Sequence, residues 1–191
     1  MAMRDLIQRG FTLIELLIAV AIFTLLALLA LPMYGDMIAN TEVRNATESV
    51  LTGLRAAQSQ AIHFNSPARF VLAADGWQVQ VTDPDSNDYD LVACVAGSGV
   101  QKQTCARTYK FNEGANRASV SATGTVTFNG YGQIIKNADG TDPLASVDVT
   151  TTAISNPRTL RVLIGGTGVA AGMKMCDPAY ASSDPVGCPT T

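Results

Sequence analysis

The residue that stands out chemically is Glu15, a carboxylate inside an otherwise apolar stretch, because no side chain from Leu16 to Gly35 is charged at neutral pH. A charge in the middle of a membrane helix costs about 2.5 to 3.5 kcal/mol on insertion scales, so it needs a partner or a function. Cleavage between Gly10 and Phe11 would create an α-amino group, and this amine on one subunit could pair with Glu15 on another. The pattern therefore predicts an assembly signal. The alternative is a carboxylate that reaches the lipid headgroups.

Four cysteines form the second group of reactive side chains, and all of them fall in the part of the chain that we expect outside the cytoplasm. They are Cys94, Cys105, Cys176 and Cys188. Oxidation is favoured in that compartment. Three pairings are open, of which two local loops, Cys94 with Cys105 and Cys176 with Cys188, are the simplest. Each would stabilise the fold by about 3 kcal/mol in the loop-entropy description. A zinc site is the competing interpretation, but the sequence has no C-x-x-C pair.

Three other motifs suggest chemistry that their details do not support. The single histidine, His63, rules out a histidine cluster, and we expect it near a helix end. Residues 83–90 begin like a calcium loop, but Asp88 replaces the glycine and Cys94 replaces the final glutamate, which favours a solvated acidic turn. Residues 165–168 are rich in glycine without a following Lys-Ser/Thr, as in a hairpin connection. We expect no metal, no cofactor and no catalytic site.

The segment that carries Glu15 is long enough to cross a membrane. Residues 1–10 contain Arg4 and Arg9, and they precede an apolar run that continues to Gly35. A run of this length spans a hydrocarbon layer of about 30 Å, and the basic flank is expected to stay in the cytoplasm. The A-x-A pattern of a signal-peptide cleavage site occurs in the middle of the run, at residues 19–21, and not near its end, which contains Leu31 and Pro32. We therefore expect a leader at 1–10 and a retained transmembrane and assembly helix at 11–35.

A helical pattern continues beyond the apolar segment, through residues 36–64. Apolar residues recur there at spacings of three or four, which predicts an amphipathic helix half covered by a globular layer. The residues of this face are Ala39, Val43, Ala46, Val50, Leu54, Ala57 and Ala61. Pro32 predicts a kink or local unwinding between the two helical parts. The tripeptide from Asn65 to Pro67 predicts the end of the helix.

Residues 65–191 have the pattern of a β-rich domain. Asp75 and Gly76 lie between two apolar runs and predict a hairpin. Gly, Asn, Asp and Pro clusters separate the strand candidates. These candidates are residues 70–72, 77–81, 91–95, 108–112, 118–122, 125–129, 133–136, 146–151, 159–164 and 169–176. We predict an α+β fold in which a long N-terminal helix packs with its second half on an antiparallel β domain of two sheets or one strongly curved sheet.

Composition excludes several classes of protein. A chain of 191 residues has room for one domain of ordinary size, so a multidomain enzyme is not expected. A net charge of −3 argues against a general nucleic-acid binder with a strongly basic surface. Apolar residues make up 47% of the sequence and recur to its end, which excludes intrinsic disorder.

The heptapeptide from Arg9 to Glu15, R-G-F-T-L-I-E, resembles the processing motif of type IV pilins and pseudopilins. In that family a prepilin peptidase cuts after the glycine and methylates the new N-terminal phenylalanine. The resemblance implies that Gly10 is the cleavage residue, Phe11 the methylated terminus and Glu15 the carboxylate that registers subunits. It also implies that Pro32 is the helix-kinking proline common in the family.

Two downstream segments narrow the resemblance to the FimU/FimT minor pilins, whose β domain is shared with the H-type minor pseudopilin of type II secretion. They are F-N-G-Y-G-Q-I at residues 128–134 and the Cys-Asp-Pro ending that begins at Cys176. Several FimT proteins bind DNA through a G-R-x-R segment before the penultimate cysteine. Here that place reads G-M-K-M, so one cation, Lys174, remains. With Arg158 and Arg161 it gives three candidate DNA contacts, for which scattered surface charge is the better interpretation.

The resemblance implies a structural, non-enzymatic role. Our first hypothesis is a minor pilin of the initiation or tip complex of a type IV pilus, which supports pilus assembly and so twitching motility, adhesion or DNA uptake. The alternatives are a DNA-binding subunit for transformation, which is not favoured, and the H-type pseudopilin. The implied partners are other major and minor pilins, the prepilin peptidase and the inner membrane. The implied location is the inner membrane and periplasm, then the extracellular pilus.

Overall fold

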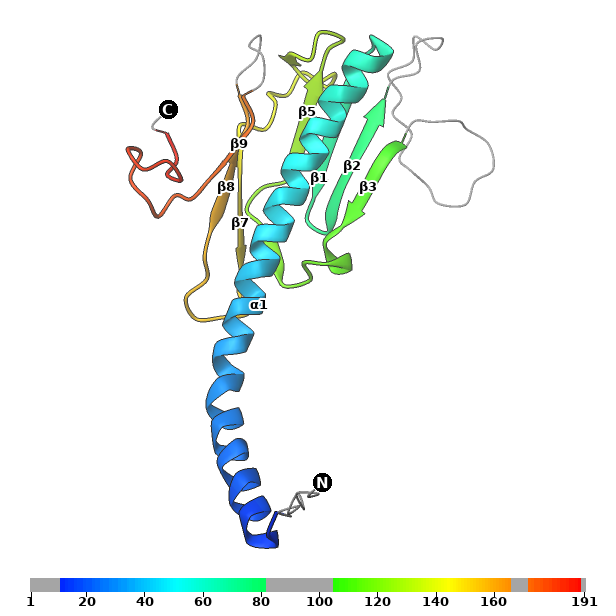
Figure 1. Cartoon of the computed structure of the whole chain (residues 1–191). Coiled ribbons are helices and arrows are strands. Elements are labelled where there is room, and N and C mark those ends of the chain that lie inside the picture. The colour runs from blue at the N-terminus through cyan, green and yellow to red at the C-terminus, as the bar shows by residue number, and fades with distance from the viewer. Residues whose placement is uncertain (1–10, 82–104, 166–171, 190–191) are drawn as a thin grey trace, which may run out of the picture. The chain divides into compact units, whose positions relative to one another are not determined.

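A computed structural model describes residues 11–81, 105–165 and 172–189, except for the side chains of residues 29–33 and 105–106. The described residues form one long helix, nine short strands and one 3-10 turn. The chain divides after Ile38 into two compact units, which we describe separately. The helix continues from the first unit into the second, and all the described strands belong to the second unit (Figure 1).

Helix α1 extends over Leu13–Phe64. Thr12 is its N-cap residue, because its hydroxyl and its carbonyl accept hydrogen bonds from the backbone N–H groups of Glu15 and Leu16. At the other end Asn65 has a left-handed backbone with φ of 46°, and the N–H of Ser66 donates to the carbonyl of Ala61. This is the hydrogen bond of a Schellman-type C-cap. The predicted end of the helix at Asn65 is confirmed.

The second half of α1 packs its apolar face on the β domain. The seven residues expected on this face, from Ala39 to Ala61, are all fully buried. Between them, residues such as Arg44, Asn45 and Arg55 are exposed. The helical spacing of three and four residues therefore correctly predicted which side of this segment faces the core.

The strands form two antiparallel sheets (Figure 1). The five-stranded sheet has the order β3-β2-β1-β5-β6, and the four-stranded sheet has the order β4-β7-β8-β9. Every described pair of strands is antiparallel. The strands are β1 Ala68–Ala73, β2 Gly76–Val81, β3 Cys105–Lys110, β4 Ala118–Val120, β5 Gly124–Phe128, β6 Ile134–Ile135, β7 Ser146–Thr151, β8 Leu160–Leu163 and β9 Lys174–Cys176. The α+β fold class is as predicted, and of the two expected arrangements, two sheets or one strongly curved sheet, the structure has two sheets.

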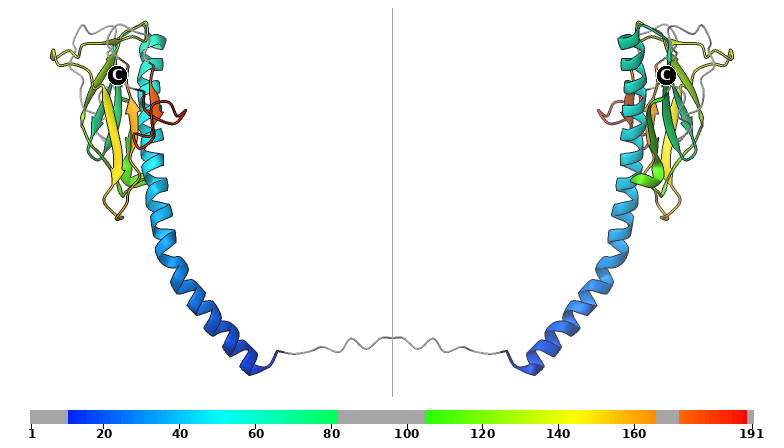
Figure 2. Two further views of the ribbon diagram at one scale, coloured as in Figure 1. Left: turned by 90° about the vertical axis from the view of Figure 1, so that its left-hand side faces the viewer. Right: turned by 90° about the vertical axis from the view of Figure 1, so that its right-hand side faces the viewer.

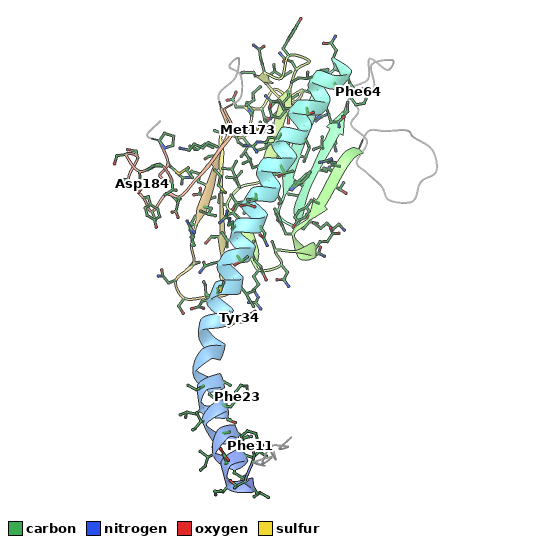
Figure 3. All side chains as sticks on the ribbon, in the orientation of Figure 1. Phe11, Phe23, Tyr34, Phe64, Met173 and Asp184 are labelled. Atoms are coloured by element: carbon green, nitrogen blue, oxygen red, sulfur yellow. A yellow bond between two sulfur atoms is a disulfide. The ribbon has the colours of Figure 1, made fainter. Side chains whose placement is uncertain are left out.

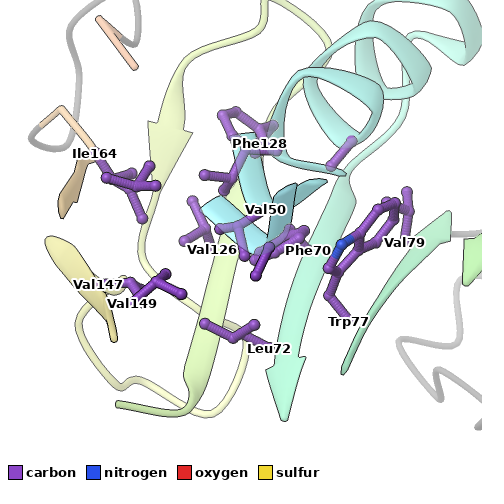
Figure 4. Close-up of a cluster of buried hydrophobic side chains, with 14 of the residues drawn as sticks. Val50, Phe70, Leu72, Trp77, Val79, Val126, Phe128, Val147, Val149 and Ile164 are labelled. Carbon is purple, nitrogen blue, oxygen red and sulfur yellow. The ribbon is translucent and has the colours of Figure 1, made fainter. Parts of the chain in front are cut away.

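A single hydrophobic core joins the helix to both sheets (Figure 4). Val50 and Leu54 of α1 belong to this core with Phe70 of the five-stranded sheet and Val147 of the four-stranded sheet, and all four side chains are fully buried. Figure 2 shows both sheets on the same side of the second half of α1. Because the core draws on all three elements, the helix from Ala39 onward is part of the β domain.

The strand boundaries differ from the prediction in a few places. Strand β3 ends at Lys110, and Phe111–Glu113 form the 3-10 turn η1. The turn buries Phe111, whose N–H donates to the carbonyl of Asp75 at 2.9 Å, and it leaves Asn112 and Glu113 exposed. The candidate strand at 133–136 is only two residues long. The candidate at 91–95 and the first part of the candidate at 169–176 lie outside the described residues.

The β1–β2 hairpin is present, but its connection differs from the expected one. Ala73 pairs with Gly76, so the two connecting residues are Ala74 and Asp75. Neither Gly76 nor the connecting residues have a positive φ. Gly76 is instead required by close packing, because a Cβ atom there would overlap the carbonyl oxygen of Tyr109 on β3. The glycine thus allows three strands to pair closely and does not shape the turn.

Candidate functional site

The N-terminal motif lies at the start of α1. Phe11 and Thr12 precede the helix, and Glu15 lies in its first turn. The backbone N–H of Glu15 donates to Thr12 Oγ1 at 3.3 Å, and the N–H of Leu16 donates to the Thr12 carbonyl at 3.2 Å. The Phe11 side chain is 85% exposed. Phe11 and Glu15 are therefore both accessible to a partner.

Glu15 has no ion-pair partner within the part of the chain that the structure describes. A carboxylate on an apolar helix is unfavourable unless it is solvated or paired. A cation that satisfies Glu15 therefore has to come from outside these described residues, and the amine that processing would create on another subunit is one such cation.

The first unit exposes an apolar surface from Phe11 to Leu28 (Figure 3). The large apolar side chains between Phe11 and Leu28 are all more than half exposed. The hydroxyl of Thr24, a polar group on this surface, donates to the carbonyl of Val20 at 2.8 Å, so it is satisfied within the helix. A surface of this kind is stable only when lipid or protein covers it.

Among the described residues, no helix meets the length and hydropathy that a membrane crossing requires.

The backbone of α1 remains helical at position 32. The sequence predicted a kink or local unwinding at Pro32, and the unwinding does not occur. The missing N–H of a proline removes one hydrogen bond from a helix of 52 residues, and the bonds on either side maintain it. The role of Pro32 in assembly stays a prediction, since the Pro32 side chain lies outside the described ones.

One disulfide is present among the described residues, between Cys176 and Cys188. It closes the second of the two local loops expected from the sequence. Cys176 is the last residue of β9 and is buried. Next to it, Asp177 and Gly187 pair through their backbones in an isolated parallel β-bridge. Within the loop that the disulfide closes, the carboxylate of Asp177 accepts a hydrogen bond from the backbone N–H of Ala179. Cys94 and the side chain of Cys105 lie outside the described part, so the other expected pair stays a prediction.

Two of the three candidate DNA contacts are engaged with carboxylates. Arg158 Nε lies 2.9 Å from Oδ2 of Asp177, whose side chain is only 4% exposed. Arg161 makes a two-bond contact with Asp148, through Nε at 2.5 Å and Nη2 at 2.7 Å. These hydrogen bonds raise the pKa of the Arg161 guanidinium. Lys174, on the edge strand β9, is exposed. The three cations therefore do not make a patch of unpaired positive charge.

The other sequence motifs take no part in a site that the structure shows. His63 lies in the last turn of α1, and its ring packs edge-on against Phe64 with centroids 4.7 Å apart. The acidic segment at 83–90 and most of the glycine-rich segment at 165–168 lie outside the described residues. Within the described ranges there is no group of three metal-ligating side chains.

Sequence reasoning did not identify Thr12 as a residue of the site. The signal was available, because Thr12 and Glu15 have the T-x-x-E spacing of a capping box directly before an apolar run. The structure shows one half of this motif, the bond from the Glu15 N–H to the threonine hydroxyl.

Two protein families match the chain. The prokaryotic N-terminal methylation motif matches residues 7–31, which include the expected cleavage site. The family described as type II transport protein GspH matches residues 46–168, more than half of the chain.

Fimbrial proteins are similar to the chain. A fimbrial protein of Pseudomonas aeruginosa is 31% identical over 138 residues, which cover 62% of this chain and 89% of that protein. The type IV major fimbrial protein FimA of Dichelobacter nodosus is 32% identical over 125 residues, or 61% of this chain and 75% of that protein. A fimbrial protein of Moraxella nonliquefaciens is 56% identical over 39 residues, or 20% of this chain and 25% of that protein.

No solved structure matches the chain significantly. The matched families consist of structural pilins and pseudopilins and not of enzymes, and the N-terminal motif implies a membrane-anchored, pilus-associated protein. The methylation motif, the GspH match, the similarity to fimbrial proteins and a long helix packed on antiparallel sheets lead to one assignment: the chain belongs to the GspH/FimT-like family of type IV pilins.

Proposed function

We propose that this protein is a minor pilin of the initiation or tip complex of a type IV pilus. The observation that carries the proposal is the uncovered apolar surface of the first unit, which bears an accessible Glu15 near its start. Such a helix fits lipid before assembly and the same segment of other pilins after it. The β domain has its own core and needs no partner to bury it.

Processing supplies the assembly chemistry in this proposal. A prepilin peptidase cuts between Gly10 and Phe11 and methylates the new terminus, while residues 11–35 stay in the inner membrane with their N-terminus on the cytoplasmic side. The new ammonium then pairs with Glu15 of a neighbouring pilin. In a low-dielectric surrounding an unpaired charge is costly, so the pair favours helices that are in register. Residues 36–64 and 65–191 project from the membrane as an amphipathic helix and a β domain.

The proposal is tested by deleting the gene in its own bacterium and counting surface pili by electron microscopy. We expect pili to be lost or to become several-fold fewer. Complementation with the wild-type chain should restore them, whereas Glu15→Leu should not, because the apolar side chain has nothing to pair with the amine. The matched control is Thr24→Val on the same apolar surface, since the Thr24 hydroxyl bonds only to its own helix. Unchanged piliation in the deletion strain would rule out the assembly role.

An H-type pseudopilin of type II secretion is the second candidate, and the match of residues 46–168 to the GspH family favours it. The two roles differ in what the deletion removes. Loss of secreted enzymes from the medium with intact pili would identify the pseudopilin. Loss of pili with intact secretion would identify the minor pilin.

A further inference from the structure

We propose that Thr12, as the N-cap of α1, keeps the helix from extending into the cleavage site and so determines how fast the precursor is processed. The inference rests on the proposed processing between Gly10 and Phe11. Its structural basis is the pair of hydrogen bonds that Thr12 accepts, from the N–H of Glu15 to the hydroxyl at 3.3 Å and from the N–H of Leu16 to the carbonyl at 3.2 Å. With these bonds the helix begins at Leu13, two residues after Phe11.

The cap competes with an extended form of the same helix. The first N–H groups of a helix have no carbonyl partner within it, and an apolar surrounding makes unpaired N–H groups costly. The side chains of Leu13, Ile14 and Leu16 are apolar and exposed, so this turn is expected in such a surrounding. The Thr12 hydroxyl satisfies one of the N–H groups. Without the hydroxyl, the remaining way to satisfy it within the chain is to add helical residues upstream.

Gly10 is the next upstream residue of a type that serves as an N-cap. In a helix capped there, the carbonyl of Gly10 would accept a hydrogen bond from the N–H of Ile14, because α-helical bonds join residues four apart. That carbonyl belongs to the bond that the peptidase hydrolyses. Hydrolysis adds one water and leaves a carboxylate on Gly10 and an ammonium on Phe11.

A scissile carbonyl inside a helical turn is a poor substrate. A peptidase has to place hydrogen-bond donors on this oxygen as negative charge develops there, and a helical N–H already occupies it. Cleavage then requires local opening of the turn, so the rate is proportional to the fraction of molecules that are open. Thr12 is thus a positioning residue for the processing reaction, with no need for it to contact the peptidase.

The test uses the full-length precursor in lipid vesicles with purified prepilin peptidase, and mass spectrometry follows the release of residues 1–10. Thr12→Ala removes the cap and introduces the best helix former. Thr12→Asn keeps an efficient cap but changes the shape of the side chain. We expect Thr12→Ala to be cleaved about fivefold more slowly, which equals about 1 kcal/mol at 1.4 kcal/mol per tenfold change, and Thr12→Asn to be cleaved within about twofold of wild type.

Backbone amide exchange of the uncut precursor gives a second readout. In Thr12→Ala the N–H of Ile14 should exchange several-fold more slowly, because a helix capped at Gly10 supplies the Gly10 carbonyl for it. In Thr12→Asn the exchange of this N–H should match wild type.

Each other outcome identifies what is wrong. Wild-type cleavage of Thr12→Ala, or faster exchange in its first turn, would show that the helix frays without the cap and would overturn the inference alone. Slow cleavage of Thr12→Asn with normal exchange would show that the peptidase reads the threonine directly, which also overturns it. A wild-type precursor that is not cut after Gly10 would overturn the proposed processing, and this inference with it.

Discussion

At the scale of single residues, two glycines of α1 show how differently the two units use the helix. Nothing lies within 4 Å of the position that a Cβ atom of Gly35 would take. At Gly53 the added atom would lie 2.6 Å from Cε2 of Phe70 and 2.8 Å from Cδ2 of Trp77. Both rings are buried, so they have little room to move. Close packing therefore requires a residue without a side chain at position 53, whereas position 35 has room for a larger residue.

We expect Gly53→Ala to lower the free energy of unfolding of the β domain by up to about 2 kcal/mol. Overpacking costs about 1 to 3 kcal/mol, and the gain in helix propensity returns about 1 kcal/mol of it. Denaturant unfolding of the full chain in neutral detergent, followed by the fluorescence of Trp77, measures the change. Gly35→Ala is the matched control and should leave this transition unchanged. A more stable Gly53→Ala variant would show that the rings yield to the methyl group.

At the scale of elements, the β5–β6 connection shows how a short loop is held on a helix. Asn129 Oδ1 accepts hydrogen bonds from the N–H groups of Tyr131 and Gln133, both at 3.0 Å, and its amide donates to Gln133 Oε1 at 3.2 Å. Gln58 of α1 donates to the carbonyl of Gly132 at 2.9 Å. Gly132 has φ of 75°, and a Cβ atom there would overlap Ile62 of α1. One asparagine thus shapes the loop, and a glycine lets it approach the helix.

We expect Asn129→Ala to destabilise the β domain by about 2 kcal/mol, because it leaves two loop N–H groups without their acceptor. Asn129→Asp keeps both acceptor bonds and loses the donor, so it should cost clearly less. Tyr131→Ala is the control in the same loop, since its side chain is 84% exposed, and it should change stability by less than about 0.5 kcal/mol. Thermal unfolding followed by circular dichroism compares the three variants. Equal losses for Asn129→Ala and Tyr131→Ala would contradict this account of the loop.

At the scale of the whole molecule, the distribution of charge distinguishes a structural role from a DNA-binding role. The chain carries a net charge of −3, and Arg158 and Arg161 are paired with Asp177 and Asp148. Proteins that bind DNA without sequence preference rely on unpaired cations that displace counterions from phosphates. Of the three candidate DNA contacts, Arg158 and Arg161 are paired with carboxylates, so the three do not form a cluster of unpaired cations. This favours a structural role over DNA capture.

We therefore expect the full chain in neutral detergent to leave the mobility of a double-stranded DNA fragment unchanged, even at about 50 mM salt, where phosphate contacts are strong. A triple variant with Arg158, Arg161 and Lys174 changed to Ala should behave in the same way. A mobility shift that weakens with salt and disappears in this triple variant would instead support the DNA-binding alternative.

Local sequence patterns predicted the helix and most of the strands well, because the formation of each element depends on residues that are close together in the sequence. The burial of α1 from Ala39 to Ala61 follows from spacing alone, and the end of the helix follows from Asn65 and Pro67. The hairpin marked by Gly76 is present, but the reason that a glycine is needed there is not local. Tyr109, the neighbour of Gly76, lies on another strand, and no local pattern shows which strand will pair there.

The candidate sites divide in the same way. The N-terminal motif around Glu15 is contiguous in sequence, so the chain itself identified it, and the family match to residues 7–31 agrees. For the three candidate DNA contacts, the sequence showed that the side chains are basic but did not show whether they are paired. That Arg158 is paired with Asp177, and Arg161 with Asp148, depends on the alignment of β8 with β7 and β9. Charge pairing across strands depends on register, which is set by the core.

The sequence by itself determined the family, the apolar helical segment with its single carboxylate, and the α+β class, because spacing, hydropathy and a contiguous motif are properties of the chain. The tertiary structure decided which cations are neutralised, which glycines are needed for packing and where Thr12 starts the helix. These depend on distances between atoms, and for the cations and Gly53 the atoms belong to segments far apart in the chain, which only the packed core brings together.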